Sequence, residues 1–204
     1  MSGGFIVVLA ILAFAAVTIF KGVRIVPQGY KWIVQRLGKY HTTLNPGLNF
    51  VIPYVDEVAY KVTTKDIVLD IPSQEVITRD NAVLLMNAVA YINITTPVNA
   101  VYGIENYTWA IQNLVQTSLR SIVGEMDLDD ALSSRDHIKA KLKAAISDDI
   151  SDWGITLKTV EIQDIQPSST MQAAMEAQAA AERQRRATVT KADGEKQAAI
   201  LEAD

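Results

Sequence analysis

The chain has 204 residues and a net charge of −4, from 19 Lys or Arg against 23 Asp or Glu, and it contains no cysteine. This balance of charge gives no basis for nucleic-acid binding. The absence of thiols excludes disulfides, cysteine nucleophiles and thiolate zinc sites.

The first twenty residues, Met1 to Phe20, carry no charged side chain, and Lys21 follows directly. As a helix this stretch spans roughly 30 Å, the thickness of a bilayer's hydrocarbon core. We therefore predict a transmembrane anchor at residues 1–24. A cleaved secretory signal is the alternative, but no Lys or Arg precedes the apolar run. The predicted anchoring side chains are Phe5, Ile6, Val7, Val8, Leu9, Ile11, Leu12, Phe14, Val17, Ile19 and Phe20.

Positive charge lies on the C-terminal side of this run, at Lys21, Arg24, Lys31, Arg36 and Lys39. Because Lys and Arg tend to stay in the cytoplasm, the pattern predicts that the bulk of the chain is cytoplasmic. The expected location is the cell inner (plasma) membrane, with a single pass.

Residues 25–60 have the composition of short strands and turns, with a turn at Asn45-Pro46-Gly47. The segment that follows, Leu48 to Val55, is almost wholly apolar. One interpretation is a buried core strand. The other is a membrane-proximal loop that dips into the bilayer surface, through Leu48, Phe50, Ile52, Pro53 and Tyr54.

Residues 60–96 alternate between apolar and polar positions, which predicts consecutive strands with a hairpin turn at Asp80-Asn81. Two amphipathic helices follow, one capped by Asn106 and one opening at Ser133-Ser134-Arg135-Asp136. The last strand, 155–165, changes its apolar phase, which predicts a bulge near Thr159. The fold class is α+β, an antiparallel sheet with flanking helices.

The tail from residue 167 to Asp204 is rich in Ala, Glu, Gln, Arg and Lys, which predicts the start of a long coiled-coil helix. The pattern is unbroken at Asp204, so we expect the helix to continue beyond it and to be cut short here. Glu182 and Arg186 have the spacing of an ion pair. A solvated single helix is the alternative. The predicted oligomerisation residues are Met171, Met175, Glu176, Glu182, Arg183 and Arg186.

No catalytic motif is present: neither histidine, His41 or His137, has a metal-ligand spacing. Ser133, Ser134 and Asp136 are hydrolase residue types, but neighbours on one helix turn do not make a catalytic triad. The acidic cluster of residues 125–130 lacks the glycine and terminal glutamate of a calcium loop. We predict no catalytic residue, no cofactor and no metal, and hence that the chain is not an enzyme.

Several segments resemble the SPFH (band 7) family in the order in which they occur. They are Ile25-Val26-Pro27-Gln28-Gly29, Val34 to Tyr40, Pro46 to Pro53, Gln74 to Asn81, Leu119 to Gly124, Trp153-Gly154-Ile155 and Met175-Glu176-Ala177-Gln178. Within the family the chain is most similar to the stomatin and bacterial QmcA type. The resemblance implies a membrane-proximal SPFH subdomain at 25–60 and an SPFH domain at 61–166, followed by the tail helix from 167.

The resemblance also implies a function. Such proteins are non-enzymatic scaffolds on lipid bilayers, which form large homo-oligomeric rings or cages around a membrane microdomain. Some regulate AAA membrane proteases of the FtsH type. Two alternatives stay open, a monomeric lipid- or protein-binding module and a membrane-bound hydrolase.

Overall fold

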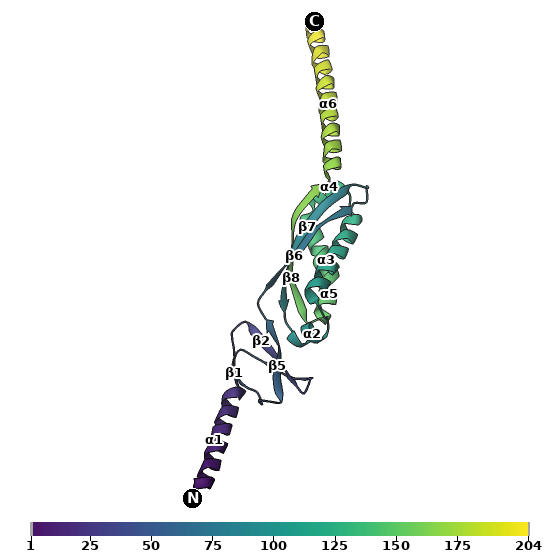
Figure 1. Ribbon diagram of the computed structural model, residues 1–204. Coiled ribbons are helices and arrows are strands. Elements are labelled where there is room, and N and C mark those ends of the chain that lie inside the picture. Colours follow the sequence, from purple (N-terminus) through teal and green to yellow (C-terminus); the bar gives the residue numbers. More distant parts are fainter. Residues whose placement is uncertain (1, 204) are drawn as a thin grey trace.

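A computed structural model describes residues 2–203 as an elongated molecule, with a helix at each end and two sheet regions between them (Figure 1). The N-terminal part holds α1 (Ser2–Gly22), β1 (Val23–Val26), β2 (Tyr30–Arg36), β3 (Lys39–Leu44), β4 (Gly47–Phe50) and β5 (Asp56–Thr63). The larger part holds β6 (Ile67–Ile77), β7 (Val83–Ile94), α2 (Pro97–Tyr102), α3 (Tyr107–Gly124), α4 (Leu128–Ser133), α5 (Arg135–Asp152) and β8 (Ile155–Pro167). The last helix is α6 (Ser169–Ala203).

The N-terminal part contains two small antiparallel sheets, β1–β4 and β3–β2–β5. Chain reversals between the strands use glycines with positive φ, among them Gly38 and Gly47, where residues with a Cβ are strained. The core of this part is small and consists of Val26, Val34, Leu44 and Val51.

The larger part is built on the antiparallel sheet β6–β7–β8, and helices α3 and α5 cover one of its faces (Figure 1). Every second side chain of each strand faces the helices, because successive side chains of a strand point to opposite faces of the sheet. The buried layer joins strand and helix residues, including Ile71, Leu84, Met86, Ile92, Ile111, Val115, Leu119, Ile138, Leu142 and Ile146. This is the α+β arrangement that the sequence predicts.

Local predictions within this part are also confirmed. The side chain of Asn106 accepts a hydrogen bond from the Trp109 N–H at 3.0 Å and so caps α3. The register of β7 and β8 shifts between the pairs Tyr91–Thr159 and Ile92–Leu157, which is the bulge expected near Thr159. The turn at Asp80-Asn81 closes β6 onto β7, with Asn81 at a positive φ.

The prediction of a transmembrane anchor at residues 1–24 is wrong. Within residues 2–203, no helix is both long enough and apolar enough to cross a membrane. Helix α1 begins with small and polar residues, so its continuous apolar stretch runs only from Phe5 to Phe20, before Lys21. That stretch spans roughly 24 Å at 1.5 Å per residue, less than a hydrocarbon core of about 30 Å. Met1 and the side chain of Ile6 lie outside the described part.

The predicted location is wrong for the same reason as the anchor. A single-pass protein of the inner membrane with a cytoplasmic bulk depended on that span and on the charges that follow it, and the structure does not support it.

Two other expectations differ from the structure. Leu48 to Val55 is no buried core strand: it contains the short strand β4 and a turn, and Leu48, Phe50 and Tyr54 are exposed. The capping arrangement expected around Ser134 is also wrong, because the side chain of Ser134 makes no capping hydrogen bond to α5.

Candidate membrane-contact and assembly surfaces

The β1–β4 ribbon presents apolar side chains to solvent at the end of the molecule that carries α1. Its register places Val23 opposite Phe50 and Ile25 opposite Leu48. A two-stranded ribbon cannot bury both of its faces, so these side chains lack cover. We call the exposed set the apolar end; it consists of Phe20, Ile25, Leu48, Phe50, Ile52 and Tyr54, each more than half exposed.

The backbone of the apolar end is fixed by hydrogen bonds from its surroundings. Val51 donates its N–H to the carbonyl of Gly22 at 2.8 Å, which ties the segment to the last residue of α1. Ile52 donates its N–H to the carboxylate of Asp56 at 2.9 Å. The Lys21 ammonium lies 5.5 Å from the centre of the Tyr54 ring, a cation–π distance.

An ion pair supports this turn from within the neighbouring sheet. The guanidinium of Arg36 binds both carboxylate oxygens of Asp56, with Nε–Oδ1 at 2.7 Å and Nη2–Oδ2 at 3.1 Å. The side chain of Asp56 is only 4% exposed. The hydrogen bonds from Arg36 and from the Ile52 N–H lower the pKa of Asp56 from 3.8 to about 2. These contacts therefore fix the conformation of the turn that displays Ile52 and Tyr54.

The second candidate surface is α6, which leaves the larger part of the molecule at the end away from α1 (Figure 1). Its first turns still contact that part, since Met171 packs against the core. A groove of about 470 Å³ lies between these turns and α4, and its lining includes Asp80, Asp129, Met175 and Glu182. Beyond the groove the described side chains of α6 are exposed.

Charges on α6 pair along the helix. Glu182 accepts hydrogen bonds from the Nε atoms of Arg185 and Arg186, each at 3.1 Å. These contacts, Arg185 first, lower the pKa of Glu182. The sequence predicts the Arg186 partner from its i,i+4 spacing but misses Arg185, which the equally favourable i,i+3 spacing would have indicated. Glu176 and Arg183, the other predicted charged positions, are exposed.

The hydrolase-type residues are not brought together as a catalytic site. Ser133 donates its hydroxyl to the carbonyl of Asp129 at 2.7 Å, which is a local helix bond. His137 is exposed on α5. Among the described residues no group of three or more His, Asp or Glu side chains is placed to hold a metal ion.

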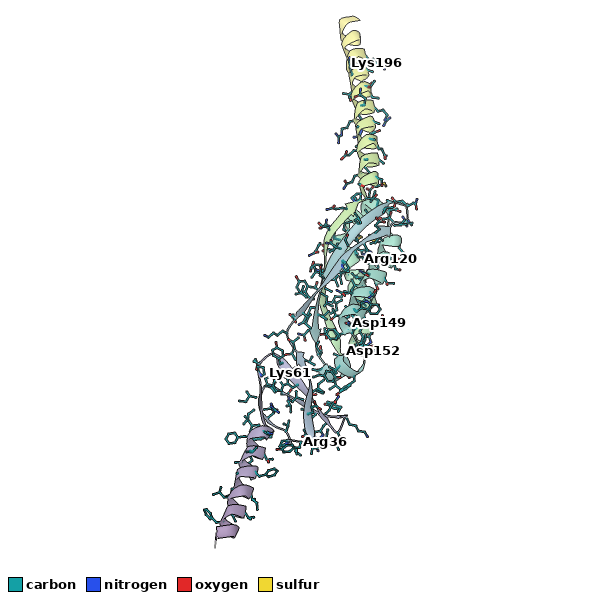
Figure 2. The ribbon with its side chains drawn as sticks, viewed as in Figure 1. Arg36, Lys61, Arg120, Asp149, Asp152 and Lys196 are labelled. Atoms are coloured by element: carbon teal, nitrogen blue, oxygen red, sulfur yellow. The ribbon has the colours of Figure 1, made fainter. Side chains whose placement is uncertain are left out.

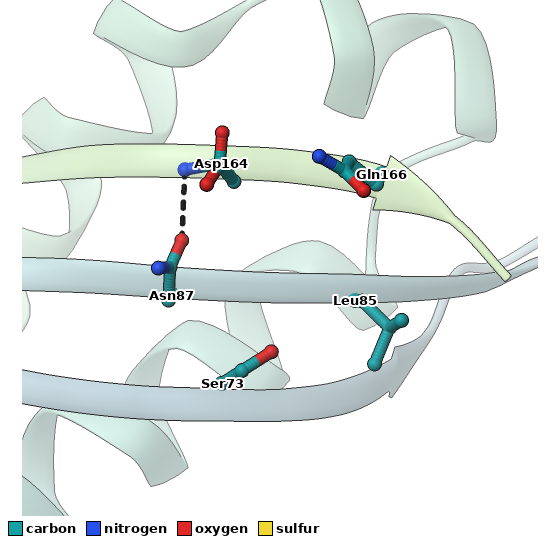
Figure 3. A pocket seen from close by; sticks show the side chains of 5 residues that line it. All are labelled: Ser73, Leu85, Asn87, Asp164 and Gln166. Carbon is teal, nitrogen blue, oxygen red and sulfur yellow. Dashed lines mark hydrogen bonds between the residues drawn. The ribbon is translucent and has the colours of Figure 1, made fainter.

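A shallow pocket of about 120 Å³ lies on the sheet face away from the helices (Figure 3). Its lining is Ser73, Leu85, Asn87, Asp164 and Gln166. The Asn87 side chain accepts a hydrogen bond from the Asp164 N–H at 2.8 Å and donates one to Gln163 at 3.0 Å. The lining contains no histidine, and its one carboxylate, Asp164 of β8, lies two strands away from Ser73 of β6, so the pocket lacks the nucleophile–base pair of nucleophilic catalysis.

The family comparison and the similar proteins indicate the same family. Residues 24–196 match the model of the SPFH domain / Band 7 family. A stomatin homologue of Pyrococcus horikoshii is 40% identical over 195 residues, covering 96% of this chain and 73% of the relative. Human mitochondrial stomatin-like protein 2 is 38% identical over 175 residues, covering 86% of this chain and 49% of the relative.

An uncharacterised protein of Methanothermobacter thermautotrophicus is 39% identical over 195 residues, and the chain spans 60% of its length. The chain therefore corresponds to part of several longer relatives. The family match covers both sheet regions and most of α6. The chain belongs to the SPFH domain / Band 7 family.

Proposed function

We propose that this chain is a membrane-associated scaffold whose copies assemble side by side into a large ring or cage around a patch of membrane. The observation that carries the proposal is the separation of surfaces along the molecule. The apolar end and α1 lie at one extremity, and the exposed helix α6 lies at the other (Figure 1). Contact with a bilayer through the first extremity leaves the larger sheet region and α6 available to neighbours.

The apolar end suits contact with the lipid surface. Exposed apolar side chains that cluster on one side of a soluble domain mark interaction sites. The ordered backbone around Ile52 holds the cluster in place, so little conformational entropy is lost when it meets lipid. The neighbouring cations Lys21 and Arg24 are placed to meet anionic headgroups. This contact needs no span of the bilayer.

Assembly of weakly interacting copies is favoured on a membrane. Tethering to a surface raises the effective concentration of each copy, and a closed ring repeats the same contact around its axis. We assign part of this contact to Met171, Met175, Glu176, Glu182, Arg183 and Arg186 of α6. The proposed clients are membrane proteins, with an FtsH-type AAA protease as the candidate that the family resemblance implies.

Vesicle binding tests the lipid contact. Changing Leu48 and Phe50 together to Asp should lower the partition onto anionic vesicles more than tenfold, because burying each side chain contributes roughly 1.5–3 kcal/mol. The matched control is Ile77→Asp with Leu85→Asp, which adds the same two charges at exposed apolar residues of the larger sheet. Equal loss in both variants, or no loss in either, would contradict the assignment.

Native mass in solution or detergent tests the assembly. The wild-type chain should form a large complex of uniform mass, and Ala180→Pro in α6 should reduce it, because proline in a helix interior costs about 3 kcal/mol. Ala180→Ser serves as the control that leaves the helix intact. A wild-type monomer at all concentrations would reject the scaffold and favour a monomeric binding module.

A further inference from the structure

The sheet β6–β7–β8 has one face that no described element covers. Helices α3 and α5 pack on the opposite face (Figure 1). Near its lower end the open face carries Val68, 59% exposed, directly opposite Tyr91 in the register and 36% exposed. We propose that this Val68–Tyr91 patch binds a second copy of the same chain, and that the occupant is the exposed Trp109 of that copy. The proposal rests on the side-by-side assembly described above.

Trp109 has the character of an interface residue. It lies near the start of α3 and is 65% exposed, while Ile111, Val115 and Leu119 of the same helix are fully buried. At 100° per residue Trp109 points away from that buried stripe. Tryptophan is enriched among the interface residues that contribute most of the binding energy. In the single chain, the Trp109 side chain is exposed to solvent.

The edges of the sheet are less available than its face. On the β6 edge, Gln112 of α3 donates its side-chain N–H to the carbonyl of Asp70 at 2.8 Å. On the β8 edge, Lys143 of α5 donates to the carbonyl of Lys158 at 3.0 Å. Pro72 also lies within β6. Side chains on both edges, and a proline on the β6 edge, oppose strand-to-strand pairing between copies, so the open face is the better contact.

Trp109 and the Val68–Tyr91 patch lie at the same height along the direction of β6. Copies related by rotation about an axis normal to a membrane carry each residue at the same distance from that membrane. Hydrogen bonds from Gln112 to the Asp70 carbonyl and from Gln74 to the Gln116 carbonyl, at 2.8 and 3.0 Å, align α3 alongside β6 in the same direction. Trp109, one helical turn before Gln112, is therefore level with Val68, two strand residues before Asp70.

One charge on each face matches at the same height. Strands β6, β7 and β8 carry four carboxylates, Asp70, Glu75, Glu161 and Asp164, against one lysine, Lys158. Glu161 already pairs with Lys139 of α5 in the same chain. Arg120 of α3, which Figure 2 labels, binds the side chain of Gln74, the residue before Glu75, at 3.0 Å. A neighbour's helical side thus presents Arg120 at the height of Glu75.

The contact joins two different surfaces of the chain. Such a heterologous contact repeats from copy to copy and closes into a ring when the rotation permits. The open sheet face of each copy would hold the helical side of the next. This assigns a direction to the ring and puts the apolar end at one rim and α6 at the other, where α6 supplies the further contact proposed above.

Disulfide cross-linking tests the contact directly, because the chain contains no cysteine. The full chain carrying both Val68→Cys and Trp109→Cys should, when oxidised on vesicles, give a ladder of cross-linked dimers, trimers and larger species. Either single variant should give none. Mixing the two single variants should give a dimer and nothing larger, because each copy then offers only one half of the contact.

The matched control is Ile77→Cys with Trp109→Cys. Ile77 is also exposed on the open face but lies nine residues farther along β6, roughly 30 Å away, so this pair should not cross-link. Equal ladders in both double variants, or none in either while these variants still form the large complex, would overturn this contact and leave the scaffold standing. A monomeric wild type would overturn both.

Discussion

Asp56 connects the apolar end to the sheet that supports it. Its carboxylate accepts hydrogen bonds from the Arg36 guanidinium of β2 and from the Ile52 N–H of the exposed turn. The two contacts stabilise the ionised carboxylate, which is why the pKa of Asp56 falls to about 2. This role was not predictable from the sequence, because Arg36 and Asp56 are 20 residues apart and no local pattern joins them.

Asp56→Asn should lower the free energy of unfolding, and the effect should depend on pH. A carboxylate whose pKa is lowered on folding contributes stability above its unfolded value of about 3.8, and this contribution is lost as pH falls toward about 2. Denaturant unfolding of both proteins should therefore give a constant difference above about pH 5, which shrinks between about pH 4 and pH 2.

The control for this change is Glu57→Gln, an exposed carboxylate beside it on β5. It should leave the unfolding curve close to that of the wild type. A difference for Asp56→Asn that is the same at pH 2.5 and pH 7 would show that the charge of Asp56 is not what stabilises the turn.

Long helices and strands are predictable from the apolar periodicity of this sequence, and short helices are not. The alternation in β6 and β7 and the stripe of α3 follow directly from side-chain geometry. Helices α2 and α4 have six residues each, too few for a helical period to be visible. Pro97 begins α2, because its fixed φ suits a first helical position.

The connection from α5 to β8 depends on Gly154. Its φ is +67°, and a Cβ added there would lie 2.5 Å from the carbonyl oxygen of Thr96. Gly154 also accepts hydrogen bonds from the N–H groups of Thr95 and Thr96 through its own carbonyl, both at 2.9 Å. Backbone this closely packed cannot move aside for a side chain.

Gly154→Ala should therefore destabilise the chain by more than about 2 kcal/mol, the sum of a left-handed alanine and a backbone clash. The matched control is Gly38→Ala: its φ is +81°, but no atom lies within 4 Å of the added Cβ. That variant should lose only about 1 kcal/mol. Denaturant unfolding compares them, and equal losses would mean that the clash at Thr96 is relieved at little cost.

The misjudged parts of the whole molecule are those where burial depends on what surrounds a segment. A count of uncharged residues predicted a span at 1–24, but the count included the small and polar residues before Phe5. Likewise, the apolar composition of Leu48–Val55 allowed a core strand, yet the ribbon that contains β4 has only β1 as a partner. Composition gives the preference for burial, and only the topology determines whether cover exists.

The two sheet regions meet at Tyr102, the last residue of α2. Its ring makes edge-to-face contacts with Tyr40 of β3 and Tyr60 of β5, with centroids 6.3 and 5.9 Å apart. Its hydroxyl accepts a hydrogen bond from Gln35 of β2 at 2.7 Å. One side chain of the larger part thus contacts all three strands of the sheet β3–β2–β5, and it helps to set the angle between the two regions.

Tyr102→Ala should loosen this junction and leave the larger core intact. Edge-to-face pairs contribute about 0.5–1.5 kcal/mol each, so the loss at the junction should be about 1–3 kcal/mol. Hydrogen–deuterium exchange should rise in α2, β3 and β5 and stay unchanged in α3. Tyr102→Phe keeps both ring contacts and loses only the bond from Gln35, so its exchange should rise less. Unchanged exchange in β3 and β5 after Tyr102→Ala would mean that the chain connection after β5, and not the tyrosine cluster, fixes the two regions together.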